Sequence, residues 1–476
     1  MHQTINSGTK VMAPHTVKLS EVTHIYFLGV GGIGMSALAR YYKRLGYAVA
    51  GYDKTETPLT KELVSEGIAV NYSEDITFLQ QHISTISTTL IVLTPAIPSQ
   101  HIELVFLQIN NYTIYKRSQV LGHISATQPT LAIAGTHGKT TTSSLLGHIM
   151  QCHAPTIAFM GGITANYNSN LLLPHTITAQ TPCVVEADEY DRSFLTLHPQ
   201  VAAITSVDAD HLDIYGTHDY LLQSFELFAQ QVNQTVIIKH ELNFKPTTKA
   251  TQLTYSLNDS AAHYYATNIV NIHGFYHFNI VTPNEVISSI EFGMAGLHNV
   301  ENAIAATAVA LQLPSVNSAT IKQALRSFLG VKRRFEYIVR TPQIIYIDDY
   351  AHHPAELTAF ISSVKKLYPT KRLTGVFQPH LFTRTRDFAQ GFSQSLSLLD
   401  DCLLLPIYPA RELPIAGITS EMLLDSVTSP FKAVVQKQNL IAELTTLHPE
   451  IILTIGAGDI DAFIPEVKQL ALKLTS

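Results

Sequence analysis

The sequence LAIAGTHGKTTTSSLLGHIM, residues 131–150, combines a short apolar run, a glycine turn and a helical pattern. The turn ends in Gly138-Lys139-Thr140, as phosphate-binding loops do, although the loop is shortened and its first glycine is Gly135. Backbone N–H groups of such a loop cradle phosphates, a lysine brings a cation to them, and a hydroxyl can bind Mg²⁺. The stretch therefore predicts a strand, an ATP-binding loop and a helix.

A second glycine motif, GVGGIG, lies about a hundred residues upstream. Gly29, Gly31 and Gly34 satisfy G-x-G-x-x-G directly after an apolar run, and Asp53 follows at the end of the next apolar run. This pattern predicts a diphosphate on a helix N-terminus and an acid on a ribose hydroxyl, which fits a UDP-sugar as well as NAD. A strand–helix turn without a ligand is the alternative. Two such loops in one chain favour ATP hydrolysis on a nucleotide-linked substrate over hydride transfer.

Composition limits the class of protein. A chain of 476 residues is too long to fold around one ordinary hydrophobic core, so several domains are expected. The net charge of −6 gives no indication of a broad basic surface that would bind nucleic acid. The three cysteines are widely spaced, which argues against a disulfide framework. The first twenty residues contain no apolar signal segment, and no run of eighteen apolar residues occurs. We expect a cytoplasmic location and no membrane span.

Three blocks of alternating apolar runs and helical patterns indicate an α/β chain of three domains. We predict a Rossmann-like N-terminal domain (22–125), a central P-loop-type ATPase domain with a mostly parallel sheet (126–329) and a Rossmann-like C-terminal domain (330–476). Residues 250–292 are rich in β-branched residues, Tyr and His. They predict small antiparallel strands that extend the edge of the central sheet.

Two acidic clusters follow predicted strands, EADEYD from Glu186 and DADHLD from Asp208. Crowded carboxylates repel one another, so a nearby cation is a natural reason to keep them, and Mg²⁺ prefers oxygen ligands. A solvated acidic loop is the alternative. Asn299 and Asn302 share one face of a helix start, where they could bracket an adenine edge or a phosphate. Equally, Asn299 could only cap the helix.

The third block carries arginine and histidine residues, together with an aspartate and a tyrosine, at positions after predicted strands or turns. An arginine fork suits a carboxylate or a phosphate, whereas surface charge is the plain alternative. The histidine pairs lack the fixed spacing of a zinc site. The residues are Arg333, Arg334, Asp349, Tyr350, His352, His353, His380, Arg384 and Arg386.

The motifs GVGGIGMSALA, AGTHGKTTT, EADEYD, DADHLDIYG, GLHNVENA, KRRFE, DDYAHHPAE and PHLFTRTRD, taken in this order, resemble the Mur ligase family over residues 29–458. The resemblance implies three domains that bind a UDP-linked substrate, ATP and an amino acid. It also implies a reaction in peptidoglycan precursor synthesis. ATP phosphorylates the muramoyl carboxylate of UDP-N-acetylmuramate, L-alanine attacks the acyl phosphate, and phosphate leaves. Two Mg²⁺ ions and a monomer or homodimer are expected.

The same resemblance assigns roles to residues. Lys139 stabilises the transferring phosphoryl group, Thr140 and Glu186 hold one Mg²⁺, and Glu186 and His211 hold the second. Arg334 and Asp349 reach ATP from the third domain. The expected ATP-binding residues are Gly135, Thr136, His137, Gly138, Lys139, Thr140, Thr141, Asn299, Asn302, Arg334 and Asp349. The UDP-substrate residues are Gly29, Gly31, Gly32, Ile33, Gly34, Ser36 and Asp53, and the amino-acid residues are Tyr350, His352 and Arg384.

Two departures from the family pattern stand out. Many relatives read P-H-R-Y where this chain has Leu381 in the third position, so Arg384 or Arg386 would hold the amino-acid carboxylate. Other branches use a carbamylated lysine about fifteen residues after the metal-binding histidine, a region without lysine here, where Glu226 could supply the carboxylate. The lack of lysine favours the alanine-adding branch. A tripeptide-recycling ligase, an NAD-dependent oxidoreductase and a non-catalytic nucleotide sensor are the alternatives.

Overall fold

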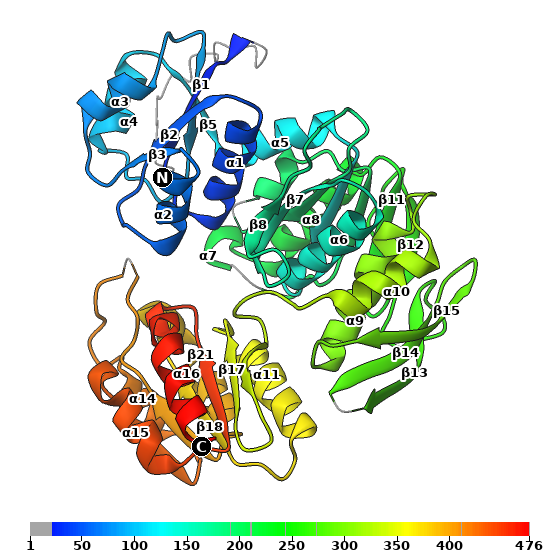
Figure 1. Cartoon of the computed structure of the whole chain (residues 1–476), viewed down its shortest axis with the longest axis vertical. Helices are drawn as coiled ribbons and strands as arrows, with labels where there is room; N and C mark the ends of the chain where they lie inside the picture. The colour runs from blue at the N-terminus through cyan, green and yellow to red at the C-terminus, as the bar shows by residue number, and fades with distance from the viewer. Residues whose placement is uncertain are drawn as a thin grey trace, which may run out of the picture.

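The computed structural model of the chain forms three lobes that follow one another in the sequence (Figure 1). Each lobe is built on one sheet with helices packed on its faces, and the central lobe adds a small second sheet. The described residues are 21–190, 192–209, 212–242, 244–272, 274–410 and 412–475. Among them, no helix has the length and apolar character needed to cross a membrane.

The N-terminal lobe contains a five-stranded parallel sheet of order β3-β2-β1-β4-β5. The strand order reverses beside β1, so the turn after β1 opens at the switch point where α/β sheets bind ligands. The strands are β1 (His24–Leu28), β2 (Ala48–Tyr52), β3 (Ala69–Asn71), β4 (Thr89–Leu93) and β5 (Thr113–Lys116). The helices are α1 (Ile33–Arg44), α2 (Pro58–Ser65), α3 (Ile76–His82), α4 (Ile102–Ile109) and α5 (Arg117–Thr127).

The central lobe contains a seven-stranded sheet of order β12-β11-β10-β6-β9-β7-β8, parallel except for the hairpin β7–β8. Its strands are β6 (Thr130–Ala134), β7 (Ile157–Thr164), β8 (Ser169–Leu172), β9 (Cys183–Ala187), β10 (Val201–Ile204), β11 (Thr235–Lys239) and β12 (Thr251–Tyr255). Its helices are α6 (Lys139–His153), α7 (Leu212–Tyr215), α8 (His218–Gln231), α9 (Leu297–Ala310) and α10 (Ser318–Ser327), with a 3₁₀ turn at Ser193–Thr196.

The predicted antiparallel strands are present, but they do not extend the central sheet. β13 (Tyr265–Ile272), β14 (Phe275–Val281) and β15 (Val286–Phe292) form a three-stranded sheet of their own. The edge of the central sheet is β12, which runs parallel to β11. The apolar residues of β14 and β15 share one core with α9 and α10, so packing against helices draws this small sheet away from the edge.

The C-terminal lobe contains a six-stranded sheet of order β16-β17-β21-β18-β19-β20, in which β16 alone is antiparallel. The strands are β16 (Glu336–Arg340), β17 (Ile345–Asp349), β18 (Leu373–Phe377), β19 (Asp401–Leu404), β20 (Phe431–Val434) and β21 (Ile451–Ile455). The helices are α11 (Pro354–Leu367), α12 (Phe382–Asp387), α13 (Ala389–Leu396), α14 (Ser420–Asp425), α15 (Leu440–Leu447) and α16 (Ile464–Lys473). The predicted three-domain α/β class is confirmed, and the boundary residues stay a prediction.

The first two lobes share one apolar core. Buried residues of α1 and α5 belong to the same cluster as buried residues of β6, β7 and β9. Tyr41 of α1 packs on Phe159 of β7, with ring centroids 5.5 Å apart. Because this packing is continuous, the glycine turn after β1 is held at a fixed position above the central sheet.

Candidate active site

The loop between β6 and α6 is shaped by its two glycines. Gly135 has φ +138°, and a Cβ there would lie 2.2 Å from Thr205 Oγ1. Gly138, the residue before α6, adopts the left-handed conformation with φ 80°. Thr205 Oγ1 donates to the carbonyl of His137 at 2.6 Å, and the His137 amide donates to Ser206 Oγ at 2.6 Å. The end of β10 therefore fixes the shortened loop at the N-terminus of α6, where anions bind.

Lys139 is held among carboxylates. Its Nζ donates to Glu189 Oε1 at 2.9 Å and lies 2.8 Å from Oε2, and the Glu189 side chain is fully buried. Burial would lower the pKa of Lys139, but Glu189, Asp188 and Glu186 outweigh it and raise the pKa. The first acidic cluster is predicted to need a nearby cation. The Lys139 ammonium group provides part of that positive charge, and its raised pKa keeps it protonated.

Glu186 stands at the end of β9 against a glycine of the neighbouring strand. A Cβ on Gly161 would lie 2.2 Å from Glu186 Oε2, so only glycine leaves room for the carboxylate. Ser143 Oγ donates to this carboxylate at 3.3 Å. Burial raises the pKa of Glu186, against the opposing effects of Lys139 and the Thr140 hydroxyl. A partly buried carboxylate with a raised pKa beside a phosphate loop is typical of a cation or substrate site.

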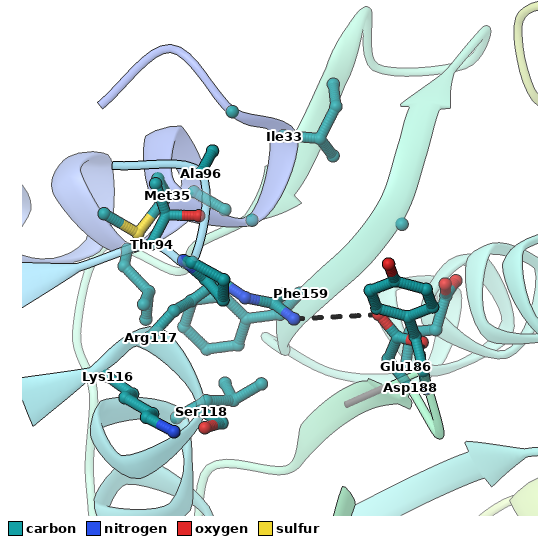
Figure 2. Close-up of a pocket in the computed structure, with 18 of the residues that line it drawn as sticks. Ile33, Met35, Thr94, Ala96, Lys116, Arg117, Ser118, Phe159, Glu186 and Asp188 are labelled. Carbon is teal, nitrogen blue, oxygen red and sulfur yellow. Dashed lines mark hydrogen bonds and ion pairs between the residues drawn. The ribbon is translucent and has the colours of Figure 1, made fainter. Parts of the chain in front are cut away.

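Glu186 also faces a cavity of ≈ 390 Å³ between the N-terminal and central lobes. The start of α1 lines one side of it through Gly32, Ile33 and Gly34 (Figure 2). Arg117, at the start of α5, crosses the cavity toward the central lobe, with Nη2 3.7 Å from Asp188 Oδ2 (Figure 2). The cavity therefore brings a helix N-terminus, a guanidinium and the Glu186 carboxylate into one space.

Other residues predicted for the first glycine motif hydrogen-bond to the loop and do not line the cavity. Asp53 Oδ2 accepts the amide of Gly31 at 2.7 Å, and Ser36 Oγ donates to the Ile33 carbonyl at 2.9 Å. Neither Asp53 nor Ser36 lines the cavity, and neither does Gly29 or Gly31. A Cβ on Gly31 would lie 2.7 Å from the Asp53 carboxylate, so this glycine allows the close approach of that acid.

A second cavity, of ≈ 320 Å³, lies between the central and C-terminal lobes. The phosphate loop lines it through His137, Gly138 and Thr141, and α9 contributes Asn299 and Asn302. The Asn302 amide donates to Asn299 Oδ1 at 3.1 Å. Asn299 itself donates to the Ala295 carbonyl at 2.7 Å, whereas the residue that precedes α9 is Gly296. The side chain of Asn299 thus ties the helix start to the chain before it.

The C-terminal lobe adds Arg334 and Asp349 to this second cavity. The Asp349 carboxylate accepts the amides of Phe335 (2.7 Å) and Ala351 (2.8 Å). Burial raises the pKa of Asp349 to about 6, partly offset by Arg334 and these amides. The Arg334 guanidinium lies 5.2 Å from the centroid of the Tyr350 ring. An arginine from one lobe and a phosphate loop from another therefore face the same space.

The residues predicted near the amino acid form a cluster outside both cavities. The rings of Tyr350 and His352 are 5.4 Å apart, and Arg384 Nη1 lies 3.4 Å from His380 Nδ1. Burial lowers the pKa of His352, and Glu356 opposes this effect. Leu381, at the departure from the family pattern, has φ 71° and precedes α12, the helix that carries Arg384. Helix α12 therefore supplies an arginine, Arg384, that contacts this histidine cluster.

Two predicted metal residues need separate mention. His211 lies outside the described residues. Glu226, on α8, accepts the Thr247 amide at 2.7 Å and lines neither cavity, so the structure does not bring it to Glu186. Within the described ranges, no group of three or more His, Cys, Asp or Glu side chains has the arrangement of a metal site.

Sequence reasoning missed several residues that line the cavities. Lys116 and Arg117 reach the first cavity, and their signal was their position at the carboxyl end of a strand, since Lys116 is the last residue of β5 and Arg117 is the first residue of α5. Glu356, which lines the second cavity, has a pKa lowered to about 2, because His352 and Arg334 outweigh its burial. The ion pair of Lys239 and Glu301 (2.9 Å) lines the same cavity, and no motif marked it.

Family models match most of the chain. The Mur ligase family, catalytic domain matches residues 24–129, the Mur ligase middle domain matches residues 133–310, and the Mur ligase, glutamate ligase domain matches residues 333–458. The matches follow one another in the order of the three lobes.

Curated relatives resemble the chain over nearly its whole length. The UDP-N-acetylmuramate–L-alanine ligase of Flavobacterium johnsoniae is 46% identical over 455 residues, which are 95% of this chain and 99% of the relative. The protein of the same name from Porphyromonas gingivalis is 45% identical over 454 residues, or 94% and 98%.

Solved structures share the fold. The UDP-N-acetylmuramate–alanine ligase of Thermotoga maritima superimposes with a TM-score of 0.78 at 24% identity, covering 94% of this chain and 99% of that one. A murein peptide ligase of Psychrobacter arcticus gives a TM-score of 0.70 at 22% identity, with 94% and 98% covered. At these identities the similarity describes the arrangement of the three lobes.

Proposed function

The chain belongs to the Mur ligase family, and on this basis we propose that it joins L-alanine to UDP-N-acetylmuramate in peptidoglycan precursor synthesis, with ATP cleaved to ADP and phosphate. The observation that carries the proposal is the placement of Glu186. Its carboxylate lines the first cavity, while its neighbours Lys139 and Thr140 begin α6 directly after Gly138, which lines the second. An acid bound in one cavity and a triphosphate in the other would meet at this loop.

The first cavity suits a nucleotide diphosphate attached to an acidic sugar. The N-terminus of α1 offers free backbone N–H groups, and Arg117 adds a fixed positive charge. We assign Arg117 to the binding of the anionic part of UDP-N-acetylmuramate. On binding, the Arg117 guanidinium would replace its 3.7 Å contact with Asp188 by a stronger contact with the substrate anion. No basic residue other than Lys116 and Arg117 lines this cavity, in the part of the chain that the structure describes.

The second cavity suits ATP. The phosphate loop would hold the triphosphate, and Asn302 and Arg334 would contact it from α9 and from the C-terminal lobe. Since residues of two lobes line the site, ATP binding would favour closure of the C-terminal lobe on the central one. Lys139 would stabilise the charge of the transferring phosphoryl group, because Glu189 already holds its ammonium group in place and charged.

Mg²⁺ fits the donors beside the loop. Thr140 supplies a hydroxyl and Glu186 a partly buried carboxylate whose charge is disfavoured by desolvation, and both are oxygen ligands of the kind Mg²⁺ prefers. A bound Mg²⁺ would neutralise the triphosphate and the muramoyl carboxylate as they approach. We assign Thr140 and Glu186 to one ion, and Glu186 with His211 to a second.

In the proposed reaction the substrates supply the reacting groups, and the C-terminal lobe binds the amino acid. The muramoyl carboxylate attacks the γ-phosphorus, ADP leaves, and the amine of L-alanine then displaces phosphate from the acyl phosphate. Tyr350, His352 and Arg384 would bind the incoming amino acid, with Arg384 on its carboxylate. UDP-N-acetylmuramate and ATP are cytoplasmic metabolites, so we propose a cytoplasmic location. A monomer or homodimer stays a prediction.

A phosphate-release assay with single omissions tests the proposal. Purified protein should release phosphate only when ATP, UDP-N-acetylmuramate, Mg²⁺ and L-alanine are all present. Replacing L-alanine by the L-alanyl-γ-D-glutamyl-diaminopimelate tripeptide should abolish the release. Release that requires the tripeptide would assign the chain to peptide recycling, and binding of ATP without any release would leave a nucleotide sensor.

A further inference from the structure

Asn170 of β8 is buried against the first turn of α1, although it belongs to the central lobe. Its Nδ2 donates to the carbonyl of Ile33 and to Ser36 Oγ (3.2 Å), and its Oδ1 accepts from Arg40 Nη1 at 3.1 Å. The exposed fraction of Asn170 is zero. An arginine can only donate, so the amide oxygen must face Arg40 and both amide hydrogens face the helix start.

The partner arginine is itself fixed. Arg40 Nη2 lies 2.9 Å from Glu62 and 2.8 Å from Glu66, both on or next to α2. These carboxylates hold the guanidinium, and the guanidinium sets the orientation of the Asn170 amide. The contact therefore joins α1, the α2 region and β8 into one rigid unit across the boundary of two lobes.

Ile33, whose carbonyl accepts the hydrogen bond from Asn170, is part of the candidate substrate site. Ile33 and Gly34 line the first cavity, and the N–H groups of this turn are the ones an α-helix leaves free. We infer that Asn170 is a positioning residue, which holds the first turn of α1 in the orientation that receives the diphosphate of the nucleotide sugar. This inference rests on the proposed function. A preformed turn binds its ligand without the entropy cost of ordering it.

A second contact between α1 and the central lobe allows a positioning role of Asn170 to be distinguished from a role in holding the two lobes together. Arg44, at the other end of α1, also contacts the central lobe, with Nη2 2.8 Å from His175 Nδ1. That contact is exposed and lies away from the cavity-lining residues. Loss of either contact would loosen the interface, but only loss of the Asn170 contact should change how the glycine turn meets its ligand.

The test compares three variants of the full chain with the wild type. Asn170→Ala removes the whole amide, Asn170→Asp keeps the acceptor for Arg40 but loses both donors to the helix start, and His175→Ala is the matched control. We expect both Asn170 variants to raise KM and Kd for UDP-N-acetylmuramate about tenfold or more, the effect of about one lost hydrogen bond to a buried group. The kcat and the KM for ATP should stay within about twofold. His175→Ala should leave all of these constants unchanged.

Hydrogen exchange gives a second readout that does not require turnover. In Asn170→Ala, the backbone amides of residues 36–39, which are the first to be hydrogen-bonded within α1, should exchange faster than in the wild type, while those of α6 keep their protection. The inference is overturned if KM for UDP-N-acetylmuramate is unchanged, or if the constants for both substrates change by the same factor. A wild-type protein that fails to bind UDP-N-acetylmuramate would instead overturn the proposed function, so the two failures are distinct.

Discussion

The pair formed by Lys139 and Glu189 allows stability and catalysis to be separated. Glu189 is fully buried and the side chain of Lys139 is 13% exposed, with 2.8 Å between the charged atoms. Replacing Lys139 by methionine leaves the Glu189 carboxylate without this cation, at a cost of about 3 kcal/mol, the lower end for a broken buried pair. In a domain of about 200 residues this lowers the midpoint of thermal unfolding by roughly 6–12 °C. Turnover should be abolished as well.

The double variant Lys139→Met, Glu189→Gln resolves the two effects. Both side chains are then neutral and close to the original volume, so thermal stability should return to within about 1 kcal/mol of the wild type. Ligation should stay absent, because no cation remains to stabilise the transferring phosphoryl group. Lys61→Met is the control, since its 3.6 Å pair with Glu56 is exposed and worth less than about 1 kcal/mol.

Differential scanning calorimetry and phosphate release measure the two quantities on the same samples. The reasoning is refuted if Lys139→Met unfolds within about 2 °C of the wild type, because the buried pair would then contribute little. It is refuted equally if the double variant forms product at a rate near that of the wild type. A stable but inactive double variant supports it.

Three further predictions follow from the geometry of the site. Glu186→Gln should abolish ligation while leaving the free protein as stable or up to about 1 kcal/mol more stable by calorimetry, because burial raises the pKa of this carboxyl and disfavours its charge. Gly161→Ala should reduce kcat at least about tenfold in a steady-state assay with little loss of unfolding temperature, because a Cβ there would displace the Glu186 carboxylate. The pKa of Asp349, raised to about 6, should appear as the acid limb of kcat/KM for ATP, and Asp349→Asn should remove that limb. Because the folded pKa lies above the unfolded value, ionised Asp349 costs stability above pH 6, and calorimetry should show this cost relieved as the pH falls from 6 to 4.

The sequence was sufficient for the elements that carry strong local signals. The two glycine motifs lie between a buried strand and a helix, as their spacing requires, and the apolar runs at β6, β9, β17 and β21 coincide with strands. Local patterns identify a strand but not its neighbour. For this reason the sequence pattern predicts β13–β15 at the edge of the central sheet, whereas they pack with α9 and α10 as a separate sheet.

The site was less predictable because its decisive contacts join distant parts of the chain. EADEYD does not reveal which acid pairs with Lys139, and only the fold selects Glu189 for the ion pair and Glu186 for the cavity. Likewise, Asp53 is a plausible ribose ligand from spacing alone, yet its carboxylate holds the Gly31 amide. Arg117 meets Asp188 across two lobes, a contact that no local motif encodes.

The proposed mechanism requires that the carboxylate of the nucleotide sugar attacks the triphosphate directly beside the loop between β6 and α6. It is tested by ligation with UDP-N-acetylmuramate carrying ¹⁸O in both carboxylate oxygens, followed by mass spectrometry of the released phosphate. Attack of the carboxylate on the γ-phosphorus predicts that each phosphate released during L-alanine addition contains one ¹⁸O atom. Phosphate free of ¹⁸O, formed at the same rate as the amide product, would contradict the account.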